Sequence, residues 1–380
     1  MALSENDKAA LALHKKLGGK ITLALRQNPD SVEKLGLFYT PGVAAVSRQT
    51  AKDPKSTRDY TWVGNNVAVV SDGSAVLGLG NIGPEGALPV MEGKALLFKH
   101  FADIDGVPIV LNTQNPDEII AIVKAIAPSF GGINLEDIAA PQCFYIEDTL
   151  KEALDIPVFH DDQHGTAIVV LAGLINALKI TKRKLSDTKI VISGAGAAGT
   201  AIIKLLHRYD GPRMFVVDSK GVISANRHDL NNEKKQLLTY TNQSSIDGSL
   251  SDIMKGADIF IGVSKGGLLT ESMVRSMNPD PIIFAMANPD PEIMPDTAKQ
   301  AGAKVIATGR SDFANQINNA VCFPGVFRGA LDNRVRMITD EHKIKAAEAL
   351  AGLVDQPRPD YIIPSVLDER TVPAIANVIR

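Results

Sequence analysis

The sequence predicts an α/β fold with two domains. The chain has 380 residues, which exceeds the ~100–200 residues of one typical domain. After residue 160, short apolar segments alternate with helical ones, and this alternation is typical of a parallel sheet that helices cover on both faces. One apolar segment runs directly into the glycine-rich turn GAGAAG. We therefore expect an N-terminal α/β domain over residues 1–160 and, over residues 161–380, a Rossmann-type domain with C-terminal helices.

Composition argues against several classes of function. The formal net charge of −3 and the lack of a long Lys/Arg run argue against a nucleic-acid partner. The N-terminus has no continuous apolar core, and no stretch of ~18 uncharged apolar residues occurs, so we expect neither a signal peptide nor a membrane span. Cys143 and Cys322 have no C-x-x-C neighbour. They predict no disulfide framework or zinc site, and they fit a reducing cytoplasm.

The elements of the first domain follow from apolar runs and helical periodicity. Residues 67–70 and 75–80 are expected to be the two arms of a hairpin around a turn at 71–73. A helix over 88–101 follows. Further on, the pattern predicts a strand at 107–112, a helix at 116–127 and a strand at 131–137.

The second domain alternates more regularly. Helices are predicted over residues 166–178 and 197–207, and again at 340–354. Residues 357–364 are expected to form a linker or loop. Short apolar strands are predicted at 189–194, 214–218, 257–263, 281–288 and 304–309.

The glycine-rich turn satisfies G-x-G-x-x-G through Gly194, Gly196 and Gly199. It follows a strand and opens a helix, and Asp218 ends the next strand 19 residues after Gly199. Glycines let backbone amides approach a pyrophosphate at the positive helix end, and the acid can accept hydrogen bonds from a ribose. The turn predicts dinucleotide binding; the alternative is a turn that serves packing alone.

A second match to the same pattern, at residues 78–83, has a different context. Pro84 follows it at once, and Asp103, 20 residues further on, precedes a strand instead of ending one. We interpret this segment as a flexible loop near a substrate.

A helical projection places Lys94 within an apolar arc. Val90, Leu97 and Phe101 fall beside it, and Lys99 falls on the opposite face. Burial lowers the pKa of a lysine, which is how an amine becomes a general base near neutral pH. The alternative is a lysine whose stem covers the core while its charged head reaches water.

Two adjacent acid pairs stand at the ends of strands. Glu136 and Asp137 follow one apolar run, and Asp161 and Asp162 follow another. Converging carboxylates suit a hard divalent cation such as Mg²⁺ or Mn²⁺. Because neighbouring side chains of an extended segment point to opposite sides, Asp161 and Asp162 are expected to differ in role. The alternative is that these acids are helix caps or solvated loop residues.

Several motifs together resemble the malic enzymes, specifically the short microbial type. The similarity runs from about residue 15 to residue 350 in the same motif order. Its motifs are YTPGVAAV, EGKALLFK, NLEDI, FHDDQHGTA, GAGAAG, AMANPDPEI and NNAVCFPGVFRGAL.

The resemblance implies a set of site residues. Tyr39 matches the general acid, Lys94 the catalytic lysine and Asp161 the acid beside it. The implied metal ligands are Glu136, Asp137 and Asp162. The implied cofactor contacts are Thr166, Gly194, Ala195, Gly196, Ala197, Ala198, Gly199, Asp218, Val263 and Asn288, and the implied substrate contacts are Asn288, Asn318 and Asn319. Larger members carry an arginine where this chain has Ser74-Ala75-Val76, which leaves open the group that neutralises one malate carboxylate.

The resemblance further implies oxidative decarboxylation of L-malate to pyruvate and CO₂, with NAD or NADP as oxidant and a divalent metal. Asp218 would repel a 2′-phosphate and so favours NAD, although Lys220 and Arg227 would soften that repulsion. Members of the family form dimers or larger homo-oligomers. Three alternatives stay open: a lyase of oxaloacetate-decarboxylase or malolactic type, a plain hydroxy-acid dehydrogenase, and a dinucleotide-sensing module.

Overall fold

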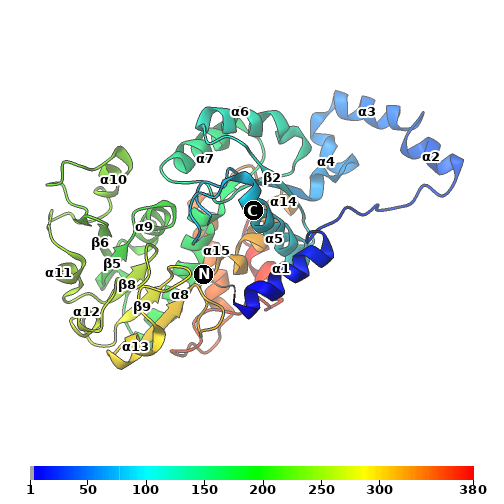
Figure 1. Ribbon diagram of the computed structural model, residues 1–380. Helices are drawn as coiled ribbons and strands as arrows, with labels where there is room; N and C mark the ends of the chain where they lie inside the picture. The colour runs from blue at the N-terminus through cyan, green and yellow to red at the C-terminus, as the bar shows by residue number, and fades with distance from the viewer. Residues whose placement is uncertain (1–3, 77) are drawn as a thin grey trace.

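The computed structural model describes residues 4–76 and 78–380, and within them the strands form two sheets. Figure 1 shows the smaller sheet beneath α6 and α7, and the larger one beside α8 and α9. The α/β class and the parallel sheets predicted from the sequence are therefore confirmed.

The first sheet has the strand order β2-β1-β3-β4, and every neighbouring pair is parallel. Side chains alternate across it, as the pleat requires. Ala68 and Val70 face a core shared with α6 and α7, and Val67 and Val69 face a core shared with α5. Its elements are β1 (Asn66–Ser71), α5 (Gly83–Ala102), β2 (Asp105–Val110), α6 (Pro116–Ile126), β3 (Ile133–Leu135), α7 (Gln142–Ala153) and β4 (Val158–His160).

The predicted hairpin is wrong. β1 pairs in parallel with β2 and β3, and its supposed second arm contributes one isolated bridge between Val76 and Gly80. Positive φ angles at Gly73, Gly78 and Gly80 curl this segment into a loop that leads into α5. Left-handed backbone cannot continue as a paired strand, so the apolar alternation here was misleading.

The second sheet has the order β10-β9-β8-β5-β6-β7, parallel except for β7. Helices α8 and α9 cover one face, and α11, α12 and α13 share the core on the other. Its strands and α9 are β5 (Lys189–Ser193), α9 (Ala197–Asp210), β6 (Arg213–Asp218), β7 (Gly221–Val222), β8 (Ile259–Gly262), β9 (Ile282–Ala285) and β10 (Val305–Thr308). The short helices are η1 (Pro54–Ser56), α4 (Thr57–Tyr60), η2 (Trp62–Asn65), η3 (Ala127–Ser129), η4 (Leu185–Asp187), α10 (Asn232–Leu237), α11 (Leu250–Met254), α12 (Glu271–Arg275) and α13 (Pro295–Gln300).

Helix α8 (Asp161–Thr181) connects the two sheets. It begins at Asp161 and not at Thr166 as predicted, because two acids suit the positive end of a helix. By length and composition it would be apolar enough to cross a membrane, but 67% of that window is buried inside the protein. Its side chains join the cores of both sheets, which explains the apolar composition.

The C-terminal helices return to the first sheet. Phe323 and Phe327 of α14 lie 4.7 and 5.3 Å from the ring of Phe98 on α5. The division of the chain at residue 160 stays a prediction, because α14 contributes to the core of the first sheet. These elements are η5 (Asn319–Val321), α14 (Phe323–Asp332), α15 (Asp340–Gly352) and α16 (Thr371–Ala376).

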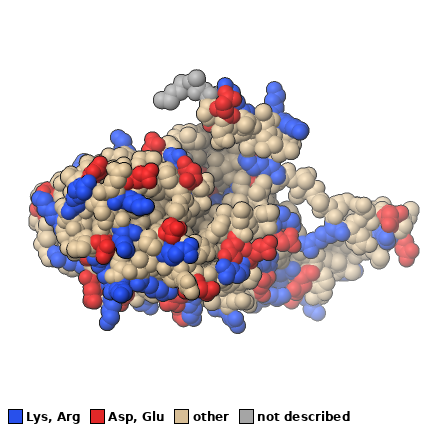
Figure 2. Space-filling view, turned by 90° about the horizontal axis from the view of Figure 1, so that it is seen from below, with Lys and Arg blue, Asp and Glu red and all other residues tan. Residues whose placement is uncertain are grey.

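The N-terminal segment stands away from both cores. It contains α1 (Glu5–Leu17), α2 (Val32–Phe38) and α3 (Val43–Lys52), and none of the described residues 4–55 is buried. In Figure 1, α2 and α3 project to the right, and the same projection is visible in Figure 2. It exposes large apolar side chains, including Leu23, Val32 and Leu37. We call residues 4–55 the N-terminal arm.

Candidate functional site

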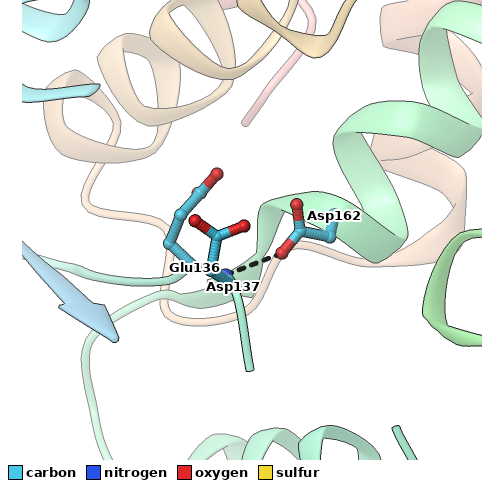
Figure 3. Close-up of side chains that lie close together, drawn as sticks. All are labelled: Glu136, Asp137 and Asp162. Carbon is cyan, nitrogen blue, oxygen red and sulfur yellow. Dashed lines mark hydrogen bonds between the residues drawn. The ribbon is translucent and has the colours of Figure 1, made fainter. Parts of the chain in front are cut away.

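The four acids singled out in the sequence meet at one edge of the first sheet. Glu136 and Asp137 directly follow β3, and Asp162 lies in the first turn of α8, directly after β4. Because β3 pairs with β4 in parallel, these ends are adjacent. One carboxylate oxygen each from Glu136, Asp137 and Asp162 lies within 4.8 Å of the others. The Asp137 N–H donates to Asp162 Oδ2 at 2.8 Å, and Figure 3 shows the three side chains around this bond.

The donor set fits a hard divalent cation. Three carboxylates supply only oxygen ligands, which Mg²⁺ and Mn²⁺ prefer. Asn134 donates to Glu136 Oε2 at 2.9 Å and so fixes one ligand carboxylate from within β3. The geometry brings these three acids together, as the sequence predicted.

Lys94 enters the same site from α5. Its Nζ lies 2.5 Å from Asp161 Oδ2 and 2.8 Å from Glu136 Oε1, and the side chain is buried. The ammonium also lies 4.1 Å from the ring centroid of Phe323. Burial by itself lowers the pKa of Lys94, but the carboxylates of Asp161 and Glu136 outweigh it and raise the pKa above the usual range. Without a bound cation to offset these carboxylates, Lys94 is therefore protonated.

The predicted apolar arc of α5 was only partly right. The buried face contains Met91, Lys94 and Phe98, whereas Val90 is 40% exposed. Lys94 is nevertheless buried, and Lys99 points to solvent with more than half of its side chain exposed. The snorkelling alternative does not hold for Lys94, because its charged end lies among buried carboxylates.

Asp161 and Asp162 contact different partners, as expected, but the extended backbone from which this was predicted is wrong. They are helical and not extended, so successive side chains differ by about 100° around the α8 axis. Asp161 faces Lys94 and Asp162 faces Asp137. Burial raises the pKa of Asp161 to about 6, against the lowering effect of Lys94.

A further buried acid, Glu147 of α7, holds the turn that carries Asp161 and Asp162. It accepts hydrogen bonds from the His160 N–H at 2.9 Å, Gln163 Nε2 at 3.1 Å and His164 Nε2 at 2.9 Å. Lys151 Nζ lies 2.6 Å from Glu147 Oε1. Burial by itself would raise the pKa of Glu147, but His164 and Lys151 outweigh it and hold the pKa well below the usual range. Glu147 is therefore an ionised carboxylate with four donors.

The glycine-rich turn opens into a cavity of about 970 Å³. A Cβ on Gly194 would lie 2.8 Å from the Val263 carbonyl oxygen, and one on Gly199 would lie 2.0 Å from the Gly194 carbonyl oxygen. Gly196, at the N-terminus of α9, faces open space. Packing therefore requires two of the glycines, and the third leaves room for a ligand at the helix end. Other lining residues include Ala195, Asp218 and Val263, and Ala197 and Ala198 begin α9.

The remaining predicted contacts lie between the two sites or near them. Thr166 is half-buried one helical turn after Asp162. Asn319 lies against the same turn, since a Cβ on Gly165 would be 3.0 Å from Asn319 Cβ. Asn318 caps η5 through Ala320 N–H. Asn288 borders the loop between β1 and α5, because a Cβ on Gly78 in that loop would be 3.4 Å from the Asn288 carbonyl oxygen.

Tyr39 is the exception. It directly follows α2 on the N-terminal arm and is 68% exposed. Figure 1 shows α2 and α3 projecting away from α5 and α8, which carry Lys94 and Asp161. The single chain does not bring Tyr39 to the other site residues.

Sequence reasoning missed Glu147, Asn134 and Phe323. An acid among the apolar residues Cys143, Ile146 and Leu150 of α7 would have signalled Glu147. No comparable signal marks Phe323, whose contact with Lys94 depends on the return of α14 to the first sheet. Cys143 and Cys322 are free, as expected, and both are buried.

Together these features define a protein in which a dinucleotide-binding sheet is joined to a second α/β sheet by a cluster of acids and a lysine. Residues 163–378 match the family described as "Malic enzyme, NAD binding domain". Residues 20–117 and 112–151 match "Malic enzyme, N-terminal domain". The chain belongs to the malic enzyme family.

Individual relatives carry different cofactor names. The bifunctional malic/malolactic enzyme of Bacillus subtilis is 56% identical over 97% of this chain and 91% of its own length. An NADP-dependent malic enzyme of Halomonas elongata is 45% identical over 98% of this chain and 92% of its own. The crystal structure of an NAD-dependent malic enzyme from Thermotoga maritima superposes with a TM-score of 0.95 at 49% identity, over 97% of this chain and 98% of that one.

Proposed function

We propose that the protein oxidatively decarboxylates L-malate to pyruvate and CO₂, with NAD or NADP as oxidant and Mg²⁺ or Mn²⁺ as activator. The observation that carries this proposal is the buried contact of Lys94 with Asp161 and Glu136, beside two further acids and next to the helix that leads to the dinucleotide turn. A non-catalytic dinucleotide sensor would have no use for such a lysine. The free, buried cysteines are consistent with a cytoplasmic enzyme.

The residues of the chain divide the proton transfers. Lys94, once neutral, accepts the proton of the C2 hydroxyl, and Asp161 at 2.5 Å is placed to share it. Asn288 and Asn319 hold the substrate carboxylates. Once C2 has lost its hydride and become a carbonyl, the C3–C4 bond breaks, its electron pair forms the enolate, and CO₂ is released. Tyr39 then gives a proton to C3, which completes pyruvate.

A nicotinamide cofactor and a divalent cation would supply the remaining chemistry. A bound nicotinamide would accept the hydride from C2, and a cation held by Glu136, Asp137 and Asp162 would stabilise negative charge on the substrate oxygen. That cation would also offset the charge of Glu136, which now favours protonated Lys94. With the charge of these acids compensated, burial would lower the pKa of Lys94 and so favour the neutral amine.

A second candidate function is a malolactic or oxaloacetate-decarboxylating lyase without net reduction of the cofactor. It is favoured by the name of the Bacillus subtilis relative, which is a bifunctional malic/malolactic enzyme. Such a lyase would keep the acids and Lys94. A plain hydroxy-acid dehydrogenase, by contrast, would retain the C4 carboxylate in its product.

One assay separates these functions. The protein is incubated with L-malate, Mn²⁺ and either NAD or NADP, while absorbance at 340 nm, pyruvate, oxaloacetate and lactate are followed. We expect pyruvate and reduced cofactor in equal amounts. Pyruvate without reduced cofactor would indicate a decarboxylase, lactate a malolactic enzyme, and oxaloacetate without pyruvate a plain dehydrogenase.

The role of Lys94 has a matched control on the same helix. Lys94→Ala should lower kcat by about 10²–10⁴-fold, the usual contribution of a general acid or base. Lys99→Ala removes an exposed lysine from the opposite face and should leave kcat near the wild-type value. Equal activities of the two variants would exclude Lys94 from the chemistry.

The N-terminal arm supports a homodimer in which Tyr39 serves the site of the partner. The arm exposes several large apolar side chains, and Lys20 contacts Glu92 and Pro89 on α5. Such a surface requires cover in water, and a second copy of the chain would cover it isologously. This arrangement reconciles the exposed position of Tyr39 with a role as general acid.

Mixed dimers test this assignment. Tyr39→Phe and Lys94→Ala chains are combined by co-expression, each being inactive alone. If the tyrosine comes from the partner, each heterodimer contains one intact site, and random pairing restores about one quarter of wild-type activity. If Tyr39 serves its own chain, no combination has an intact site and the mixture stays inactive.

A further inference from the structure

Arg310 lies in the loop after β10, beside a residue that is expected to hold a substrate carboxylate. A Cβ on Gly309 would be 2.9 Å from Asn288 Nδ2, so the backbone that leads into Arg310 packs against the amide of Asn288. Arg310 Nη1 donates to the Pro289 carbonyl oxygen at 3.1 Å. Because β9 and β10 are parallel neighbours, Asn288 and Arg310 follow them at the same edge of the second sheet.

The turn at Asn288 and Pro289 also contacts a loop of the first sheet. A Cβ on Gly78, between β1 and α5, would be 3.4 Å from the Asn288 carbonyl oxygen and 3.6 Å from Pro289 Cδ. In the same loop, the segment Ser74-Ala75-Val76 supplies no positive charge. Arg310 therefore brings a cation, from the second sheet, to a place where the two sheets meet.

The charges of the catalytic cluster require such a cation. Its four carboxylates are those of Glu136, Asp137, Asp161 and Asp162, and Lys94 lies among them. A divalent ion would offset two of the negative charges and Lys94 offsets a third, which leaves the cluster with one negative charge. L-Malate would add two more, and an uncompensated carboxylate that is removed from water is costly. The cluster therefore suits one end of malate, and the far carboxylate requires a positive group from elsewhere.

The guanidinium of Arg310 is held in place and still has donors for a ligand. Its Nε and Nη2 donate to the two oxygens of Asp312 at 2.8 and 2.7 Å, and it lies 5.3 Å from the ring of Phe313. With the bond to Pro289, these contacts to described residues use three of its five N–H groups and leave two. Asp312 is 55% exposed, so water weakens this ion pair, and its main effect is to orient the arginine. The planar fork of an arginine matches the geometry of a carboxylate.

We propose that Arg310 binds the C4 carboxylate of L-malate and so makes the site selective for a dicarboxylate. The inference rests on the proposed function, because it takes malate as the substrate, with its C1 carboxylate and C2 hydroxyl toward the cation. Asn288 contributes a neutral amide beside the guanidinium. Because the contact with C4 is made before the C3–C4 bond breaks, Arg310 contributes to substrate binding and not to proton transfer.

Two ligands that differ only at C4 test this role. L-Malate carries a carboxylate there, and (S)-2-hydroxybutanoate carries a methyl group. Isothermal titration uses the whole chain with Mn²⁺ and without dinucleotide, so that no turnover occurs. Wild-type protein should bind L-malate about 10–100-fold more tightly, the usual contribution of a hydrogen bond between charged groups. Arg310→Ala should lose most of this preference and keep its affinity for (S)-2-hydroxybutanoate within about 3-fold.

Two further variants and a kinetic measurement complete the test. Arg310→Lys keeps the charge but not the fork, so it should retain part of the preference. Arg275→Ala, which removes a 57% exposed arginine on α12, should retain all of it. In malate-dependent reduction of the cofactor, Arg310→Ala should raise KM for L-malate by about 10–100-fold and leave kcat within about 3-fold of the wild type.

The remaining outcomes contradict the inference. An unchanged preference for L-malate in Arg310→Ala would exclude Arg310 from the substrate site, and continued turnover of malate would leave the proposed function standing. An equal loss of both ligands would show that Arg310 only supports the loop after β10. Equal binding of the two ligands by wild-type protein that oxidises malate would show that no cation holds C4. If wild-type protein neither binds L-malate nor reduces NAD or NADP with it, the proposed function fails, and this inference fails with it.

Discussion

Replacement of Glu147 by alanine is expected to destabilise the chain and to loosen the turn that carries Asp161 and Asp162. The carboxylate of Glu147 is 2% exposed and receives four donors, which come from the end of β4, from α7 and from the start of α8. Two of these donors are the His160 N–H and Gln163, which flank the two aspartates. Alanine removes the acceptor, so these donors must bind water or remain without a hydrogen-bond partner.

The contacts set the size of the effect. Breaking a buried charge pair by removal of one partner costs about 3–5 kcal/mol. Lys151 keeps 15% exposure, and a small cavity beside His164 can admit water, which places Glu147→Ala at about 3 kcal/mol of unfolding free energy. Glu147→Gln keeps the shape and one acceptor oxygen for the His160 N–H, so it should cost about 1–2 kcal/mol.

Urea denaturation of both variants and of Glu152→Ala measures these losses. Glu152 lies on the same helix but is exposed, so its replacement should change stability by less than about 0.5 kcal/mol. Isothermal titration with Mn²⁺ should show about 10–100-fold weaker binding in Glu147→Ala, the usual cost of losing a group that orients metal ligands. A loss below about 1 kcal/mol in Glu147→Ala, with unchanged Mn²⁺ affinity, would contradict this role of Glu147.

Two further predictions concern the same turn. In Gly165→Ala the new Cβ would lie 1.9 Å from Asp161 Oδ1. Asp161 must then move away from Lys94, and kcat should fall by about 10-fold or more. The control is Gly93→Ala on α5, whose new Cβ would meet nothing within 4 Å and which should retain wild-type kcat. Stability should fall on acidification, because burial lowers the pKa of His164 from 6.5 to about 3 and the unfolded chain then binds the extra proton. Between pH 6.5 and 5 this linkage amounts to about 2 kcal/mol of unfolding free energy. In urea titrations at several pH values, His164→Gln should flatten the pH dependence of the unfolding free energy. An unchanged pH dependence in this variant would contradict the prediction.

Much of the fold was predictable because buried parallel strands leave apolar runs in the sequence. β5, β8, β9 and β10 all lie within predicted segments, and β6 begins one residue before its predicted segment. The acids at the ends of β3 and β4 were also predictable, since parallel neighbours end at one edge. The loop after β1 was mispredicted because apolar alternation does not reveal left-handed glycines.

Other parts of the site depend on contacts between distant segments. The partners of Asp218 come from Arg227 in the loop after β7 and Lys234 in α10, and no spacing rule joins them to β6. Glu147 acts through the packing of α7 against β4, which periodicity cannot specify. The exposed position of Tyr39 follows from the path of the N-terminal arm, and its motif alone gives no hint of that path.

We propose that Glu136, Asp137 and Asp162 hold, beside Lys94, the cation on which the proposed malate oxidation would depend. Isothermal titration of EDTA-treated protein with Mn²⁺, in the presence of L-malate, tests it directly. We expect one Mn²⁺ per chain in the wild type and in Asp155→Asn, whose side chain is 97% exposed. We also expect loss of that binding in Glu136→Gln and Asp162→Asn. Unchanged stoichiometry and affinity in those two variants would contradict the assignment of the metal centre.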